Sequence, residues 1–156
     1  MRLGFIGTGK IASSVITGIC MSKISFQKIL VSRRNKKIAQ KLKKRFRKVY
    51  IATTNQEIAD KCNWIFLSVT PKVGKKILPK LKFKSNQKII SFIATINLAQ
   101  LTKTLGRRIK IVRAIPLPPI SIKKGPVPIC PPDKQVKSFF NKIGTTVEIK
   151  NERTSK

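Results

Sequence analysis

The sequence begins with a short apolar segment, residues 3–6, which runs directly into Gly7-Thr8-Gly9 and then into a helical pattern. An apolar strand pattern followed by an amphipathic helix pattern recurs along most of the chain. The alternation predicts strands at 3–6, 28–32, 49–52, 64–69, 88–93 and 109–114, and helices at 10–22, 36–46, 72–80 and 97–105, with a further helix beginning after Thr54. Such spacing predicts right-handed crossovers and a mostly parallel sheet with helices on both faces. We therefore expect one α/β domain over residues 1–150 and a polar tail over residues 151–156.

Seven prolines between residues 116 and 132 interrupt the alternation. Because proline lacks an amide hydrogen, such a segment cannot form a central strand or the interior of a helix. We expect a loop here, with a short edge strand near residues 127–130. One more helix, over 133–143, and a last strand, over 146–149, are predicted to follow.

The glycine-rich segment has the form G-x-G-x-x-A, with Gly7, Gly9 and Ala12 at the defining positions. It lies between a predicted strand and a predicted helix, which is the context that a dinucleotide-binding fingerprint requires. The first glycine permits the tight turn, the second lets the backbone approach a pyrophosphate, and the small third residue allows close packing. The free amides and positive end of the helix would then face the phosphates. The sequence thus predicts a Rossmann-like, doubly wound α/β fold that binds a dinucleotide.

The end of the second predicted strand indicates which dinucleotide is preferred. NAD-binding domains of this kind place an Asp or Glu there, which binds the ribose hydroxyls and would repel a 2′-phosphate. This chain has Ser32-Arg33-Arg34 and no acidic residue at that place. Because guanidinium groups bind phosphate in a bidentate manner, we predict NADP as the cofactor. The alternative interpretation is that both arginines belong to a generally basic surface.

Several segments, in order along the chain, carry a resemblance to a known family. They are Gly4-Phe5-Ile6-Gly7-Thr8-Gly9-Lys10-Ile11-Ala12-Ser13, Ser32-Arg33-Arg34, Asn55 with Ile58-Ala59-Asp60, Phe66-Leu67-Ser68-Val69-Thr70-Pro71, Ile89-Ile90-Ser91-Phe92-Ile93-Ala94 and Val112-Arg113-Ala114-Ile115-Pro116. They are similar to the amino-terminal domain of pyrroline-5-carboxylate reductases, which transfer a hydride from NADPH to a cyclic imine in proline biosynthesis. The likeness covers about residues 3–149.

This resemblance implies NADPH and a small cyclic imine as ligands, and it implies a set of cofactor-binding residues. They are Gly7, Thr8, Gly9, Lys10, Ile11, Ser32, Arg33, Arg34, Asn55, Val69, Thr70, Pro71 and Ala94. Ala94 and the loop after Arg113 would lie near the nicotinamide.

The sequence departs from the family at three places. Thr70 stands where the family usually has a lysine, and Leu117-Pro118 stands where it has an Asn-Thr pair. The carboxy-terminal helical domain, which in the family forms the dimer and the substrate pocket, has no counterpart in these residues. The resemblance therefore implies a truncated protein or one that depends on a partner for activity, and we assign no catalytic residue and no oligomeric state.

Composition narrows the remaining possibilities. The chain has 35 Lys and Arg, 5 Asp and Glu and no His, which leaves a formal charge of +30. Without histidine there is no His-based triad, metal site or general base, and we predict no metal. Three widely spaced cysteines favour a reducing, cytoplasmic compartment, and no apolar run is long enough to span a membrane.

Two other functions remain open at this stage. One is a dinucleotide-binding module without catalytic activity. The other, which we favour less, is a basic nucleic-acid-binding protein, since clustered lysines and arginines attract phosphate backbones. The lysines are spread over nearly every predicted surface segment, however, rather than gathered on one face.

Overall fold

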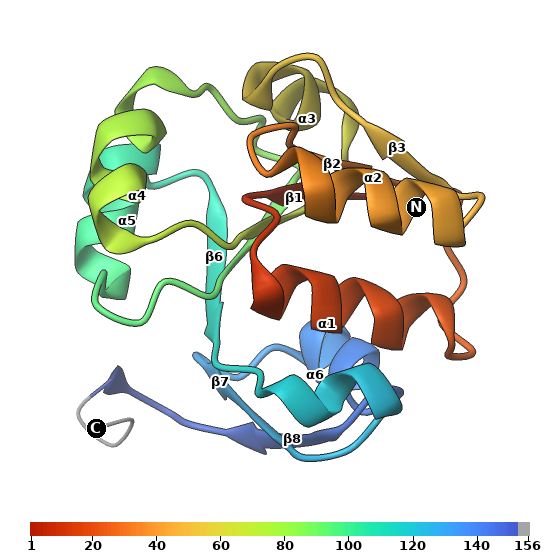
Figure 1. Ribbon diagram of the computed structural model, residues 1–156. Helices are drawn as coiled ribbons and strands as arrows, with labels where there is room; N and C mark the ends of the chain where they lie inside the picture. The colour runs from red at the N-terminus through yellow and green to blue at the C-terminus, as the bar shows by residue number, and fades with distance from the viewer. Residues whose placement is uncertain (153–156) are drawn as a thin grey trace.

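The strands of the computed structural model are β1 (Arg2–Ile6), β2 (Lys28–Val31), β3 (Val49–Ile51), β4 (Trp64–Leu67), β5 (Lys88–Ser91), β6 (Lys110–Ala114), β7 (Pro126–Cys130) and β8 (Thr145–Glu148). The structure describes residues 1–152, and within this range the strands form one sheet in the order β3-β2-β1-β4-β5-β6-β7-β8. Neighbouring strands are parallel except β6 and β7, which are antiparallel. The first six strands follow the order 3-2-1-4-5-6 of doubly wound dinucleotide-binding sheets. The predicted Rossmann-like α/β fold is therefore confirmed (Figure 1).

The helices are α1 (Lys10–Cys20), α2 (Lys36–Arg45), α3 (Asn55–Lys61), α4 (Pro71–Ile77), α5 (Leu98–Leu105) and α6 (Lys134–Phe140), with the short 3-10 helices η1 (Leu78–Lys80) and η2 (Pro118–Ile122). Local sequence sets where several of them begin. The Thr54 hydroxyl and the Asp133 carboxylate each accept a backbone amide at the start of α3 and α6. Asn97 and Gln100 form a capping box at the start of α5. These bonds satisfy amides that the first turn of a helix leaves unpaired.

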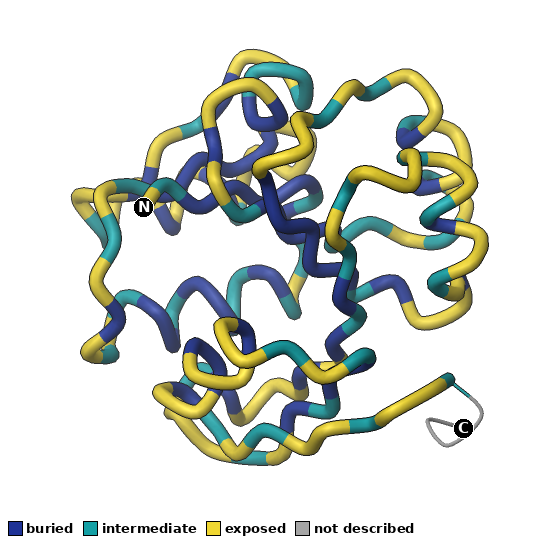
Figure 2. The backbone as a smooth tube through the Cα atoms, turned by 180° about the vertical axis from the view of Figure 1, so that it is seen from behind, coloured by how far each residue is buried: buried dark blue, intermediate teal, exposed yellow. Residues whose placement is uncertain are grey.

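Apolar side chains fill a layer on each face of the sheet. Helices α1, α2 and α6 cover one face, and α3, α4 and α5 cover the other. Phe5 and Phe66 are register neighbours on β1 and β4, and their rings stack with centroids 4.4 Å apart. Figure 2 shows buried backbone running through the central strands and along the inner turns of the helices. Helix α2 buries only a narrow stripe, Ala39 and Leu42, because lysines and arginines occupy most of its other positions.

The proline-rich segment departs from prediction at one point: β7 is an interior strand between β6 and β8, and not an edge strand. Pro126 and Pro128 are two residues apart, so both missing amide hydrogens fall on the β6 side, where the pairing spans only two residue pairs. On the other side the amides of β7 are intact. The carbonyl oxygen of Ile129 accepts the amide of Ile149 at 2.9 Å, and β8 pairs with residues 126–129 of β7.

Of the predicted polar tail, the structure describes residues 151 and 152. The Glu152 carboxylate lies against the sheet, where Arg113 of β6 donates to it at 2.6 Å. The other positions of the predicted tail, residues 153–156, lie outside the described residues.

Candidate functional site

The carboxyl ends of β1, β2 and β4 meet at one edge of the sheet, where the strand order reverses. In doubly wound sheets this edge is where ligands bind. A cleft of about 520 Å³ opens there, between the loop after β1, the start of α2 and the loop from β4 into α4. Its ionisable side chains among the described residues are all basic: Arg34, Lys36 and Lys37. The cleft therefore presents positive charge to any ligand that enters it.

The loop after β1 adopts a backbone conformation that requires glycine. Gly7 has φ +98°, and a Cβ at this position would lie 2.3 Å from the carbonyl oxygen of Ser68. Two residues tie the loop to the end of β2: Ser32 Oγ accepts the Gly7 amide at 2.8 Å, and Thr8 Oγ1 donates to the Ser32 carbonyl at 3.2 Å. The turn is thus fixed by sterics on one side and by hydrogen bonds on the other.

The space beside Gly9, the residue directly before α1, is open. Gly9 is the N-cap of this helix, and a Cβ built on it would meet nothing within 4 Å. Ser68 also lines the cleft, and its Oγ is buried and finds no hydrogen-bond partner among the described residues. Buried polar atoms in native proteins are normally paired. An anionic group at the first turn of α1 would fill the open space at Gly9, so these residues fit a bound diphosphate.

Six of the predicted site residues line this cleft: Gly7, Thr8, Gly9, Arg34, Val69 and Thr70. Others lie directly behind the lining. Lys10 and Ile11 form the first turn of α1, and Pro71 forms that of α4. Ser32 is buried, and its hydroxyl is engaged in the hydrogen bond that holds the glycine loop. These positions shape the cleft rather than facing into it.

Three predicted residues are not brought to the cleft. Arg33 is exposed and is not among the lining residues, although its neighbour Arg34 is. Asn55 begins α3, after β3. Ala94 lies in the loop after β5, where its carbonyl oxygen accepts a hydrogen bond from Arg113.

Sequence reasoning missed part of the lining, namely Asn35, Lys36, Lys37, Ser68 and Val73. Three of these had a usable signal. Ser68 is the first polar residue after the apolar strand next to β1, so it had to fall at the reversal of strand order. The pair Lys36-Lys37 opens helix α2 shortly after Arg34, so all three residues fall at the same end of the cleft lining.

The other reactive groups lie outside this cleft. Burial raises the pKa of the Cys20 and Cys62 thiols to about 11, so both remain protonated at neutral pH and are poor nucleophiles. All three cysteines are free. Within residues 1–152, no group of three His, Cys, Asp or Glu side chains could hold a metal ion. No helix in this range has the length and apolar character needed to cross a membrane.

Comparison with known proteins gives consistent relatives. The pyrroline-5-carboxylate reductase of Corynebacterium melassecola is 23% identical over 159 residues, which cover 94% of this chain and 58% of the reductase. The same enzyme of Escherichia coli is 28% identical over 133 residues, which cover 83% of this chain and 49% of the enzyme. The chain therefore spans about half the length of these curated relatives.

Solved structures and family models agree with these matches. The crystal structure of Plasmodium falciparum pyrroline carboxylate reductase with NADP bound superimposes with a TM-score of 0.86 at 25% identity, over 99% of this chain and 59% of that one. The predicted resemblance to the amino-terminal part of pyrroline-5-carboxylate reductases is thereby confirmed. Residues 2–95, which include the glycine loop and the whole cleft, match a family model. The chain belongs to the family described as NADP oxidoreductase, coenzyme F420-dependent.

Proposed function

We propose that this chain binds NADP(H) in the cleft at the carboxyl edge of the sheet, as the cofactor-binding part of a reductase of the pyrroline-5-carboxylate reductase type. The observation that carries the proposal is the open position at Gly9, at the start of α1, in a cleft whose ionisable groups among the described residues are all basic. The Plasmodium enzyme, which has NADP bound in its crystal structure, matches nearly the full length of this chain.

In this proposal the cofactor lies across the edge of the sheet in the order of the strands. The free amides at the start of α1 and those of Thr8 and Gly9 hold the diphosphate, because both supply N–H donors at the positive end of a helix. Arg34, Lys36 and Lys37 hold the 2′-phosphate at the β2 side. The nicotinamide half extends past Val69 toward the loop after β5, which carries Ala94. When bound, NADPH supplies the hydride for reduction of a small cyclic imine.

The described carboxylates lie away from the cleft, and four of the five form ion pairs: Glu57 with Lys61, Asp133 with Lys88, Glu148 with Lys137 and Glu152 with Arg113. The fifth, Asp60, accepts a hydrogen bond from Gln56. The lining thus offers hydroxyls and cations but no carboxylate to act as a general acid. This observation favours a second candidate, a dinucleotide-binding module without catalytic activity.

Calorimetric titration of the purified chain with NADPH and NADH tests the binding proposal. We expect binding of both, with NADPH tighter. Replacing Arg34 by Ala should weaken NADPH binding by at least tenfold and NADH binding little, since a charge-assisted hydrogen bond contributes roughly 1.5–3 kcal/mol. Arg33→Ala is the matched control, because it removes the same charge from the adjacent residue outside the cleft. Equal effects of the two substitutions, or no heat with either nucleotide, would refute the proposal.

Catalysis is tested separately by offering NADPH and pyrroline-5-carboxylate to the same protein. Turnover supports a reductase in which this chain alone supplies all the groups that the reaction needs. Tight NADPH binding without turnover supports the binding module. The three free cysteines also fit a reducing, cytoplasmic compartment, which we include in the proposal.

A further inference from the structure

The loop between β5 and α5, residues 92–97, lies at the same sheet edge as the cleft. Its Ile93 side chain and the Val69 side chain of the cleft wall both approach Gly74 of α4, within 3.2 and 3.5 Å of the position that a Cβ would take. At its start, Ser91 Oγ accepts the amide of Ile93 at 3.1 Å. At its end, Asn97 and Gln100 cap α5. The loop is therefore the next wall of the edge beyond the cleft.

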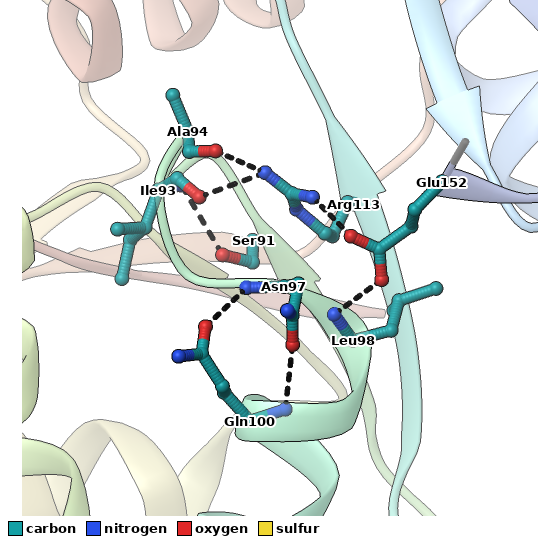
Figure 3. Close-up of polar contacts among 8 residues, drawn as sticks. All are labelled: Ser91, Ile93, Ala94, Asn97, Leu98, Gln100, Arg113 and Glu152. Carbon is teal, nitrogen blue, oxygen red and sulfur yellow. Dashed lines mark hydrogen bonds and ion pairs between the residues drawn. The ribbon is translucent and has the colours of Figure 1, made fainter. Parts of the chain in front are cut away.

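Arg113 and Glu152 hold this loop from the side of β6 (Figure 3). The Arg113 guanidinium donates to the carbonyl oxygens of both Ile93 and Ala94. It also donates to Glu152 Oε2 at 2.6 Å, while Glu152 Oε1 accepts the amide of Leu98, the first residue of α5, at 2.5 Å. The two side chains thus bind the loop at both of its ends.

The contribution of the carboxylate follows from burial and charge. The side chains of Arg113 and Glu152 are only 12% and 24% exposed. Removing one partner of such a pair leaves the other charge poorly solvated, which is far costlier than loss of an exposed pair. A carboxylate at the start of α5 is also favoured by the helix dipole. The guanidinium is therefore held between the Glu152 carboxylate and the two loop carbonyls.

We propose that Glu152 is a positioning residue: through Arg113 and the Leu98 amide it fixes the 92–97 loop, and the loop in turn supports the nicotinamide half of the bound cofactor. This inference rests on the proposed NADP(H) binding. It predicts that the two halves of the cofactor depend on Glu152 differently. The adenosine half, held by α2 and the glycine loop, lies on the other side of β1 and β4 from this pair.

The test compares two ligands on one variant. Adenosine 2′,5′-bisphosphate carries the 2′-phosphate and adenosine but no nicotinamide, so it reports the adenosine half alone. We expect Glu152→Gln to weaken NADPH binding by about tenfold, because a charge-assisted pair is lost, and to leave binding of the bisphosphate within twofold of wild type. Glu148→Gln is the matched control, since it removes the same charge from the exposed Lys137–Glu148 pair. It should change neither affinity.

Amide hydrogen exchange gives a second readout that needs no ligand. In Glu152→Gln the Leu98 amide should exchange at least tenfold faster, because its hydrogen-bond acceptor is no longer charged and is no longer held in place by Arg113. Unchanged exchange, or equal loss of affinity for both ligands, would overturn the inference. If the wild-type chain binds neither ligand, the proposed function itself is refuted. If wild type binds both ligands and Glu152→Gln binds them with the same affinities, only the role of Glu152 is refuted.

Discussion

The two glycines of the loop after β1 should respond in opposite ways to the same substitution. At Gly7 a methyl group meets the Ser68 carbonyl oxygen at 2.3 Å, and the backbone has φ +98°. At Gly9 the methyl meets nothing within 4 Å, and φ is −79°. Gly7→Ala should therefore impair folding, and Gly9→Ala should impair only the binding of a ligand.

The magnitude for Gly7→Ala follows from two terms. The unfavourable φ costs about 1–2 kcal/mol, and forcing a methyl into a packed backbone costs about 1–3 kcal/mol. A total near 3 kcal/mol lowers Tm by roughly 10 °C in a domain of this size. For Gly9→Ala, Ala is a poorer N-cap than Gly, but it also restricts the unfolded chain, which stabilises by about 0.4–1 kcal/mol. These effects oppose each other, so we expect a change in Tm of no more than about 2 °C.

Thermal unfolding and NADPH titration together give the assay. Gly9→Ala should melt with the wild type yet bind NADPH at least tenfold more weakly, since its methyl group would occupy the space assigned to the diphosphate. Gly7→Ala should melt early whether or not nucleotide is present. The reasoning fails if Gly9→Ala binds NADPH as wild type does, because the open position would then not be the phosphate site. It also fails if Gly7→Ala is as stable as wild type.

Three further predictions concern the body of the domain. Burial alone would raise the pKa of Asp133, but hydrogen bonds from Lys88 and the Val136 amide outweigh the effect of burial and lower that pKa below 3.8. The stability that the ionised carboxylate contributes is present above this pH and is lost as the pH falls below it. The free energies of urea unfolding at pH 3 and pH 7 should therefore differ less in Asp133→Asn than in wild type. The Cys62 thiol, with a pKa of about 11, should resist a thiol reagent at pH 8 in the folded protein and react on unfolding. Phe66→Ala, which empties the ring stack between β1 and β4, should cost about 3–5 kcal/mol in chemical unfolding.

The sheet could be predicted from the sequence because its signals are local. Each of the first six strands is a short apolar run, and each is bounded by residues that end it, such as Gly7 after β1 and Pro71 after β4. The placement of β7 could not be predicted in the same way. Each proline removes one backbone hydrogen-bond donor from a strand. Whether two prolines remove donors from one side of the strand or from both depends on their spacing. Here the spacing of two in Pro126 and Pro128 leaves the β8 side free to pair.

The candidate site shows the same division between local and distant signals. The glycine turn is contained in a few consecutive residues, so its conformation could be inferred directly. Contacts between residues far apart in sequence leave no such pattern. Glu152 binds Arg113 across 39 positions, and nothing around Glu152 in the sequence distinguishes it from any exposed acid. Its role is set by where β6 ends relative to α5, which only the folded sheet determines.

Ser32 illustrates how this changes the account of specificity. From the sequence, Ser32, Arg33 and Arg34 looked like one phosphate-binding run, but the structure divides them. Ser32 faces inward and accepts the Gly7 amide, so its hydroxyl is committed to the loop. Arg34 lines the cleft with two lysines of α2. Because Ser32 is committed to the glycine turn and Arg34 lines the cleft, we expect discrimination for a 2′-phosphate to rest on Arg34 and the start of α2, and Ser32 to act through the shape of the turn. Ser32→Ala should then weaken NADPH and NADH binding by the same factor, and a selective loss of NADPH binding would contradict this division.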